Sequence, residues 1–531
     1  MDAVSLEIFK SLVASVAEEM GAVLGRTGFS ANIKERRDFS CALFDHQGLM
    51  VAQAAHLPVH LGSMPASVSA VIAEMALQPG DVAILNDPYL GGTHLPDVTL
   101  VMPVFTGRGE AAELAGYVAN RAHHADIGGA APGSMPLSTE LYQEGLIIPP
   151  LKLLRNGEMD NQLMAIICRN VRTPEERRGD LEAQLACVRT GERRLLDIIR
   201  RYGLGDVREH MAGLLAYSEA LTRAAIRRIP PGRYSFEDAL DDDGLSGVPV
   251  PIKVVVTAKG DRLTFDFTGT AAETEGPVNA VLAVTESAVL YVVRCITGED
   301  IPANQGCMAP IRVIAPPGTL VNARPSRAVS AGNVETSQRI VDALLGALAK
   351  ALPGEIPAAS QGTMNNLAFG GFDDVRGRPF AYYETIAGGT GGAPSAPGLS
   401  AVQSHMTNTL NTPIEALEFD LPVRVKEYAI RRGTGGAGRH PGGDGLRRTV
   451  EFLAPADCTI VSERRSIKPY GLAGGRPGTR GRTFLHRAGS DEGAVLPSKT
   501  RLKLHSGDSI TIETPGGGGW GEPVNGELSE G

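Results

Sequence analysis

Two strongly apolar segments joined by a short polar turn constrain the fold of this chain most. They cover residues 98–105 and 114–119, and the polar residues around 107–110 connect them. Parallel strands need a crossover of a dozen or more residues, whereas a connection this short joins antiparallel neighbours. We therefore predict an antiparallel pair of strands, in which the start of the first strand and the end of the second lie at the same end of a sheet.

Polar motifs stand at those two positions. NDPYLGGTHLPD (86–97) precedes the first strand, and RAHHADIGG (121–129) follows the second. Both motifs offer imidazole nitrogens and carboxylate oxygens, which are suitable ligands for a divalent cation. Because the predicted pairing brings the motifs together, we expect a site for one divalent metal ion here, with Zn, Mn or Fe as candidates.

The best candidate ligands are His94, Asp97 and His123. His94 and Asp97 are three residues apart on a proline-stiffened loop, so both side chains can point to one centre. Three protein ligands leave a position open for water or substrate, as a catalytic metal site requires. Asp87 and Asp126 are candidates for a further ligand or for an acceptor that orients a histidine ring. A hydrogen-bonded polar cluster without a metal remains the alternative.

Other residues are candidates for catalysis or for structure. Neighbours in a strand point to opposite faces, so His124 can share an ion with its neighbour only if the segment is a loop. His124 and Asp126 are candidates to move a proton. Glu384, with the glycine-rich stretch 388–392, is a candidate to line the pocket or to bind a phosphorylated oxygen. Three further histidines are expected to have no part in the chemistry. His46 is expected at an exposed hairpin tip, and His56 and His60 are expected to be structural loop residues, with an approach to the site as the alternative.

The length of the chain indicates that it folds into several domains. At 531 residues it exceeds what one hydrophobic core normally serves. We predict an α+β fold of several domains, with mixed sheets, packed helices and a glycine-rich, β-containing C-terminal region. The predicted regions are 1–229, an α/β region with the metal site; 230–330, a β-rich region that follows Pro-Pro-Gly; and 331–531, the glycine-rich α+β region. Apolar spacing predicts helices at 5–24, 63–75 and 284–297, and a charged helical run at 161–201.

Glycine is abundant and clustered, as in AGGTGGA and TPGGGGWG. Tight turns between strands are the favoured interpretation, and loops that hold an anion are the alternative. The chain has no Gly-Lys dipeptide, so a Walker-type P-loop is absent and ATP is expected to bind elsewhere than in this chain.

Composition excludes several classes of function. The formal net charge is -9 and only 5% of residues are aromatic, so nucleic-acid binding has little support. No apolar run reaches the ~18 residues of a membrane span. The N-terminus is typical of an amphipathic helix and not of a signal peptide, and none of the six cysteines forms a CxxC pair. We therefore expect a cytoplasmic protein without membrane contact. The chain also lacks the G-x-S-x-G motif of serine hydrolases.

Long blocks of the chain resemble the hydantoinase B/5-oxoprolinase family. They include FSCALFDHQGLMVAQAAHLPVHLGSMP, GDVAILNDPYLGGTHLPDVTLV, AHHADIGGAAPGSMP, QEGLIIPP, GNVETSQRIVDALLGAL and YYETIAGGTGGAP. The resemblance implies a metal site whose ligands fall on His94, Asp97 and His123. It also implies a hydantoinase A-type partner with an actin-like ATPase fold, which binds ATP and phosphorylates a small cyclic amide. In relatives a tryptophan can stand where His124 stands, which argues against this residue as an obligatory ligand.

Three functions follow as hypotheses. The first is the B-type subunit of a two-component, ATP-dependent cyclic amidase, a hetero-oligomer that hydrolyses a phosphate-activated lactam, hydantoin or 5-oxoproline-type ring at the metal site. The second is a subunit of an ATP-dependent acetone or acetophenone-type carboxylase. The third is a non-catalytic assembly subunit in which the polar cluster only shapes a loop.

Overall fold

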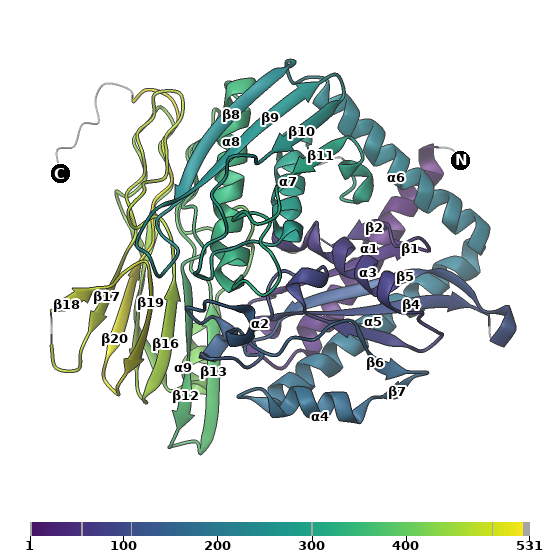
Figure 1. Ribbon diagram of the computed structural model, residues 1–531, viewed down its shortest axis with the longest axis horizontal. Helices are drawn as coiled ribbons and strands as arrows, with labels where there is room; N and C mark the ends of the chain where they lie inside the picture. Colours follow the sequence, from purple (N-terminus) through teal and green to yellow (C-terminus); the bar gives the residue numbers. More distant parts are fainter. Residues whose placement is uncertain (1–2, 55–56, 108, 299–300, 491, 524–531) are drawn as a thin grey trace.

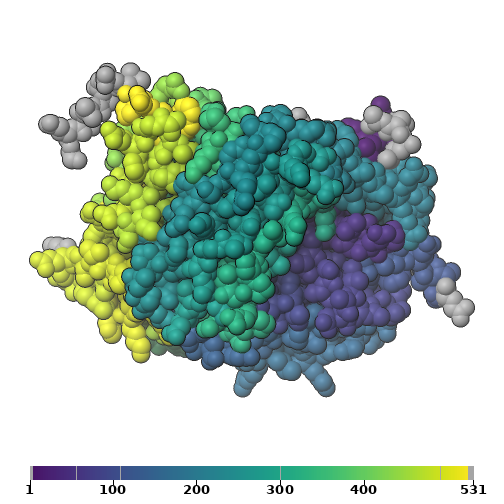
Figure 2. All heavy atoms as spheres, turned by 45° about the horizontal axis from the view of Figure 1, so that its top comes forward, coloured from purple at the N-terminus to yellow at the C-terminus, as the bar shows by residue number. Residues whose placement is uncertain are grey.

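The computed structural model describes residues 3–54, 57–107, 109–298, 301–490 and 492–523. These residues form four β-sheets with helices packed against them, which confirms the predicted α+β class. The N-terminal region, drawn in purple and blue, lies at one end of the molecule and the yellow C-terminal region at the other (Figure 1 and Figure 2). Teal segments from the middle of the chain lie between them.

The N-terminal region contains a seven-stranded sheet in the order β2-β1-β5-β4-β3-β6-β7. Neighbouring strands in it are antiparallel. The strands are β1 (Phe39–Asp45), β2 (Met50–Gln53), β3 (Val82–Leu85), β4 (Asp97–Thr106), β5 (Glu113–His123), β6 (Leu151–Arg155) and β7 (Glu158–Met159). The predicted antiparallel pair is confirmed as β4 and β5, although β5 extends through His123, which was expected to follow the strand. His46 is exposed in the turn between β1 and β2, as expected.

Helices cover both faces of this sheet. One face packs against α1 (Ala3–Thr27) and α5 (Pro174–Tyr202), and the other against α3 (Ser63–Glu74). Successive side chains of β4 point to opposite faces of the sheet. Leu100 therefore joins the core beneath α1 and α5, and Val101 joins the core beneath α3. The remaining helices of the region are α2 (Ala31–Lys34), α4 (Asn161–Arg169) and α6 (Leu204–Ile226). The charged run predicted at 161–201 is thus two helices, α4 and α5, and the second begins at a proline.

The middle of the chain forms a second sheet in the order β11-β10-β9-β8. Its elements are β8 (Gly232–Leu240), β9 (Val250–Lys259), β10 (Arg262–Asp266), β11 (Ile311–Ile314) and α7 (Leu282–Thr297). Helix α8 (Ser337–Ala351), which a π-helical turn at Gly332–Thr336 precedes, packs on β8, β9 and α7. The core under this sheet therefore continues across residue 330, and the proposed division into three domains stays a prediction.

The C-terminal region contains two further sheets, in the orders β13-β12-β16-β19 and β14-β15-β20-β17-β18. Side chains from both sheets form one shared core, which includes Phe369, Phe452 and Ile512. The elements are β12 (Asn366–Asp373), β13 (Arg378–Glu384), α9 (Ile414–Asp420), β14 (Val423–Arg431), β15 (Gly445–Phe452), β16 (Ala456–Val461), β17 (Arg482–His486), β18 (Gly493–Val495), β19 (Lys499–Leu504) and β20 (Ser509–Glu513).

The glycine clusters of this region pack against one another, so the interpretation as tight turns is wrong for them. In the segment TPGGGGWG, the N–H of Gly517 donates to the carbonyl of Gly443 at 2.9 Å. The N–H of Gly518 donates to the carbonyl of Ala359 at 2.8 Å. A Cβ atom on Gly517 would lie 2.0 Å from the carbonyl oxygen of Thr390. Glycine is required because backbone segments approach each other at hydrogen-bonding distance.

Among the described residues, no helix is both long and apolar enough to cross a lipid bilayer.

Candidate metal centre

The site is built on the pairing of Asp97 with His123. Asp97 is the first residue of β4 and His123 the last of β5, and the register places them opposite each other. His94 lies three residues earlier, in the loop that leads into β4. The potential ligand atoms of the three residues lie within 4.8 Å of one another, and all three side chains are buried. The structure thus brings together the three residues predicted as principal ligands.

The loop before β4 is held in shape by its own polar residues. The side-chain oxygen of Asn86 accepts from the N–H of Ile148 at 2.6 Å, and its amide nitrogen donates to the carbonyl of Leu95 at 2.8 Å. Gly91 has a left-handed φ of 89°, and a Cβ there would lie 2.5 Å from the carbonyl of Ala66. These contacts fix the backbone that carries the ligand candidates. Position 91 requires glycine, because only glycine fits both the φ angle and the space.

Several ligand atoms of the cluster are buried without a hydrogen-bond partner among the described residues. They are both ring nitrogens of His94, Oδ1 of Asp97 and Nε2 of His123. Buried polar atoms are nearly always paired, because leaving them unpaired costs free energy. Nε2 of His94 lies 3.4 Å from Oδ2 of Asp97, a separation that two ligands of one ion can have. The two imidazoles and one carboxylate therefore fit a divalent cation.

A small cavity of about 20 Å³ adjoins the cluster. This volume is close to what one water molecule needs. Its wall comes from all three parts of the chain, including Asp97 and His123 from the N-terminal sheet, Val334 next to α8, and Tyr383 from β13. The candidate site therefore lies where the three parts of the molecule meet.

The electrostatic surroundings favour the protonation states that bind a cation. Burial opposes ionisation of Asp97, but the imidazoles of His94 and His60 outweigh it and hold the pKa of its carboxyl well below the usual value. Burial, together with the nearby His94, holds the pKa of His123 well below that of a free imidazole. An anionic carboxylate and a neutral imidazole are the forms that ligate a metal.

His60 also belongs to the site, although sequence favoured a structural role for it. Its Nε2 lies 3.6 Å from Oδ2 of Asp97, and its Nδ1 lies 2.8 Å from the hydroxyl of Ser40. Burial lowers the pKa of His60. The imidazole lines the cavity, so it can act on a group bound there. His56 lies outside the described residues.

Asp38 is a further site residue that sequence reasoning missed. Its carboxyl lines the same cavity, and Oδ2 lies 3.7 Å from Nη1 of Arg36. Burial raises the pKa of Asp38 to about 7 even though Arg36 acts against this shift. The carbonyl of Asp38 accepts from the N–H of His123 at 2.9 Å, which places the start of β1 beside the cluster. Asp38 reaches the cluster because β1 pairs with β5, and no local sequence pattern predicts this pairing.

Two residues fix the ring of His123. The ring of Tyr383 stacks on it with centroids 4.6 Å apart, and Nδ2 of Asn32 lies 3.0 Å from its Nδ1. The hydroxyl of Tyr383 donates to Oδ1 of Asn366 at 2.7 Å, which anchors the tyrosine in turn. Groups that orient a metal-binding imidazole in this way tune the affinity of the site.

The structure does not bring Asp87 or Asp126 to the cluster. The carboxylate of Asp87 accepts from the N–H of Tyr89 at 2.9 Å and caps the short turn Pro88–Leu90. The carboxylate of Asp126 accepts from the N–H of Gly128 and pairs with Nη1 of Arg172 at 2.8 Å. Both carboxylates are occupied in shaping loops.

His124 and Glu384 are likewise engaged elsewhere. His124 faces away from His123, and its Nε2 lies 2.9 Å from the side-chain oxygen of Gln184 in α5, as expected for neighbours in an extended chain. Glu384 is buried and binds Arg448 through both oxygens, at 2.8 and 3.1 Å. The stretch 388–392 belongs to the glycine packing of the C-terminal region, where a Cβ on Gly389 would lie 1.8 Å from a carbonyl oxygen.

The fold is that of a known protein class. The family model for hydantoinase B/oxoprolinase matches residues 2–523, so the chain belongs to the hydantoinase B/oxoprolinase family. It is 41% identical to an uncharacterized protein of Methanocaldococcus jannaschii, over 100% of this chain and 92% of that protein. It is 32% identical to a putative D-/L-hydantoinase subunit of the B type from a Pseudomonas species, covering 99% and 91% of the two chains.

Other relatives are much longer than this chain. The chain is 39% identical to 5-oxoprolinase 1 of Arabidopsis thaliana, and the match covers 98% of this chain but 42% of the relative. The ATP-dependent caprolactamase of Pseudomonas jessenii has a similar structure, with a TM-score of 0.92, 27% identity, and coverage of 100% and 93%. A nucleotide-free acetone carboxylase shares the fold with a TM-score of 0.89 at 19% identity, covering 99% and 76%.

Proposed function

We propose that this chain is the metal-bearing component of an ATP-dependent cyclic amidase. It would hydrolyse a lactam, hydantoin or 5-oxoproline-type ring after an A-type ATPase partner has activated the ring by phosphorylation. The observation that carries this proposal is the buried cluster of His94, Asp97 and His123, whose unpaired ligand atoms adjoin a cavity. The names of relatives support the substrate class, since they include a hydantoinase subunit, a 5-oxoprolinase and a caprolactamase.

The metal explains why a buried polar cluster is useful in such a reaction. An unactivated cyclic amide is a poor electrophile, and phosphorylation of its oxygen makes the ring carbon more electrophilic. Addition of water and departure of the ring nitrogen open the ring to an acyl phosphate, which a second water hydrolyses to a carboxylate and phosphate. His94, Asp97 and His123 would hold a divalent ion, which would supply Lewis acidity to an oxygen bound beside it.

Residues beside the cluster have the properties of proton carriers. Nε2 of His60 lies 3.6 Å from Oδ2 of Asp97 and the ring lines the cavity, so this imidazole is the candidate to accept a proton from attacking water. The carboxyl of Asp38 lines the same cavity, so it is the candidate to give a proton to the departing ring nitrogen. Asp126 and His124, the proton carriers expected from sequence, have other partners.

The partner is part of the proposal. A relative named as one subunit of a hydantoinase supports a chain that works with a second polypeptide. The 5-oxoprolinase relative matches this chain over 42% of its own length, so other parts of that polypeptide are available for the remaining steps. We expect ATP to be bound by the partner, in a hetero-oligomer with this chain.

The decisive experiment uses this chain co-expressed with an A-type ATPase. Release of ADP and opening of the ring are both measured. Hydantoin, N-methylhydantoin, 5-oxoproline and caprolactam serve as the substrates. We expect ring opening only with both components, ATP and a divalent metal. Ketone-dependent fixation of labelled bicarbonate without ring opening would instead assign a carboxylase. Full activity of an Asp97→Ala variant would mean that this chain is a non-catalytic assembly subunit.

A further inference from the structure

A basic cleft lies in the C-terminal region, in the part of the molecule formed by residues 465–498. Its volume is about 570 Å³, which is in the range of small-molecule sites. Four cationic side chains line it: Arg465, Lys468, Arg480 and Arg482. The whole chain carries a formal net charge of -9, so this concentration of positive charge runs against the average of the protein.

Three of the four cations of the cleft lack an ion-paired carboxylate in the described part of the chain, whereas the charge of Arg465 is balanced by the nearby Glu335, Asp241 and Glu463. Within the described residues, no ion pair joins Lys468, Arg480 or Arg482 to an acidic side chain, whereas neighbouring arginines such as Arg464 and Arg487 each have one. Asp242 is the one carboxylate among the lining residues. It is already engaged by the hydroxyl of Ser498 at 2.7 Å and by Nζ of Lys499 at 3.4 Å, so it is little available to the cleft cations.

Hydrogen bonds hold the backbone segments that form the cleft. The N–H of Gly481 donates to the carbonyl of Arg464 at 3.0 Å, and the N–H of Thr479 donates to the carbonyl of Thr434 at 2.8 Å. Arg482 begins β17, which pairs with β20. The arginines on either side of Gly481 are therefore held in place by hydrogen-bonded segments, and binding an anion needs little ordering of the main chain.

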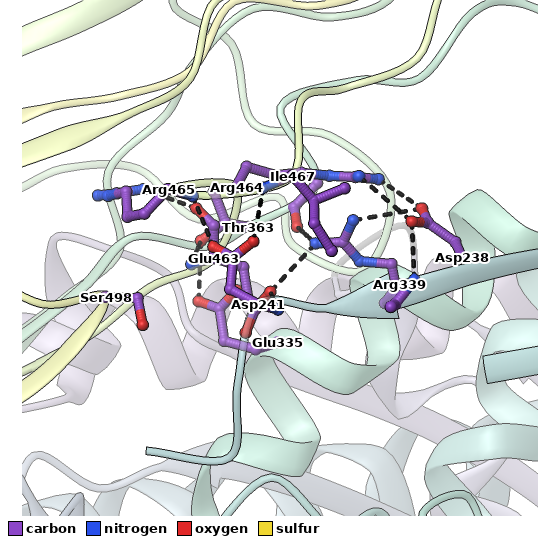
Figure 3. Close-up of polar contacts among 12 residues, drawn as sticks. Asp238, Asp241, Glu335, Arg339, Thr363, Glu463, Arg464, Arg465, Ile467 and Ser498 are labelled. Carbon is purple, nitrogen blue, oxygen red and sulfur yellow. Dashed lines mark hydrogen bonds and ion pairs between the residues drawn. The ribbon is translucent and has the colours of Figure 1, made fainter. Parts of the chain in front are cut away.

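Arg465 lies at the floor of the cleft. Its Nη1 donates to Oδ1 of Asn365 and to the carbonyl of Glu463, both at 2.8 Å, while its Nε is buried without a partner among the described residues. Figure 3 shows its side chain extending away from Asp238 and Arg339, on the opposite side of the buried ion network. A Cβ on Gly481 would lie 2.6 Å from Nη1 of Arg465, so the loop of the other arginines closes over this guanidinium.

We propose that this cleft is a binding site for a phosphate-type anion, carried by inorganic phosphate or by a phosphorylated small molecule. Guanidinium groups recognise phosphate oxygens through paired, charge-assisted hydrogen bonds, and the cleft offers three of them with a lysine. Hydroxyls of Ser466 and Thr479 line the same space and can donate to further oxygens.

The lining also limits the remainder of the ligand. No aromatic side chain lines the cleft, and its apolar contacts come from Val495, Leu496 and Pro497. A ligand that needs base stacking, such as a nucleotide, therefore finds no ring to stack on. The site takes a compact anion, and it is independent of the metal centre proposed above because the two share no lining residue.

The test is calorimetric titration of the purified chain, at constant ionic strength, with inorganic phosphate and separately with glycerol 3-phosphate. We expect binding of one anion, and a Kd that rises roughly tenfold for each charge removed in Arg480→Ala and Arg482→Ala. Lys503→Ala, which removes an exposed cation from β19 instead, should leave the Kd unchanged. Tighter binding of the ester identifies a phosphorylated small molecule as the ligand, and equal or weaker binding identifies free phosphate.

Further variants separate this site from the alternatives. Arg480→Lys combined with Arg482→Lys keeps the charge but loses paired hydrogen bonds, so binding should weaken less than in the alanine variants. Binding that disappears in Asp97→Asn but persists in the alanine variants would place the anion at the metal centre and overturn the proposal. Binding of a glutamate-rich peptide, with neither phosphate probe bound, would also overturn it in favour of an acidic protein partner.

Discussion

The rings of Tyr383 and His123 lie stacked, with centroids 4.6 Å apart and an angle of 10° between their planes. Tyr383 belongs to β13 and His123 to β5, so the C-terminal region closes a centre whose ligands come from the N-terminal sheet. The proposed metal centre is therefore complete only when both regions are folded and docked. This dependence makes metal binding a reporter of how the regions pack.

The stacking gives the first prediction. Tyr383→Ala removes the ring that orients His123, and we expect metal affinity to fall roughly 10–100-fold, as for other groups that orient a ligand. Tyr383→Phe keeps the ring and loses only the hydrogen bond to Asn366, so its affinity should stay close to that of the parent. Competition with a chromophoric chelator measures both. Equal affinity of all three proteins would contradict an orienting role for the ring.

The identity of the ligands is tested by metal content. We expect about one divalent ion per chain in the parent protein and a loss of this ion in Asp97→Asn, because the carboxylate is the one anionic member of the cluster. Asp87→Asn is the matched control, since Asp87 caps a turn outside the cluster. Elemental analysis of the purified proteins decides. An Asp97→Asn protein with full metal content would rule out the assignment.

His60 has a separable role in catalysis. His60→Gln keeps a polar side chain of similar length, and we expect metal to remain bound while turnover falls roughly 100-fold or more, the usual effect of losing a general base. His46→Gln, in the exposed turn between β1 and β2, should be silent. Ring opening by the assembled enzyme is measured beside metal content. Parallel loss of metal would make His60 a ligand and not a proton acceptor.

The sequence predicted the part of the site that local patterns describe. Apolar segments and a short turn were enough to place Asp97 and His123 at the same end of the sheet, because antiparallel neighbours leave little choice of geometry. Asp38, His60 and Tyr383 were missed because their approach depends on contacts between distant segments, which no periodicity encodes. The same limit explains Asp126 and Glu384, since their partners Arg172 and Arg448 are far away in sequence.

The glycine clusters were misread for a related reason. Clustered glycine fits both turns and close backbone packing, and only the tertiary structure separates them. Gly517→Ala should destabilise the protein strongly, by roughly 3 kcal/mol or more, because the new Cβ would meet a carbonyl of the main chain. Gly205→Ala, at an open position in helix α6, should be neutral or stabilising. Denaturant unfolding compares the two variants. Equal unfolding midpoints would show that the packed glycine segments can relax to accept the new Cβ.

The buried carboxyl of Glu335, in the network of Figure 3, predicts a pH dependence of stability. Its Oε1 accepts from Thr363 and Asn366, while Oε2 has no partner among the described residues. Burial, with a contribution from Glu463, raises the pKa of Glu335 from 4.5 to about 8. The folded protein therefore keeps a proton that the unfolded chain releases. The stabilisation is full below pH 4.5 and is lost as the pH rises towards 8.

Glu335→Gln removes this titration while keeping an acceptor at the position of Oε1. We expect its unfolding free energy to change less between pH 5.5 and pH 8 than that of the parent, by up to roughly 3 kcal/mol. Glu427→Gln, on the exposed part of β14, should follow the parent at every pH. Urea unfolding at several pH values measures all three proteins. Parallel pH profiles for the parent and Glu335→Gln would mean that Glu335 is ionised in the fold, with its charge balanced by the cations of the network.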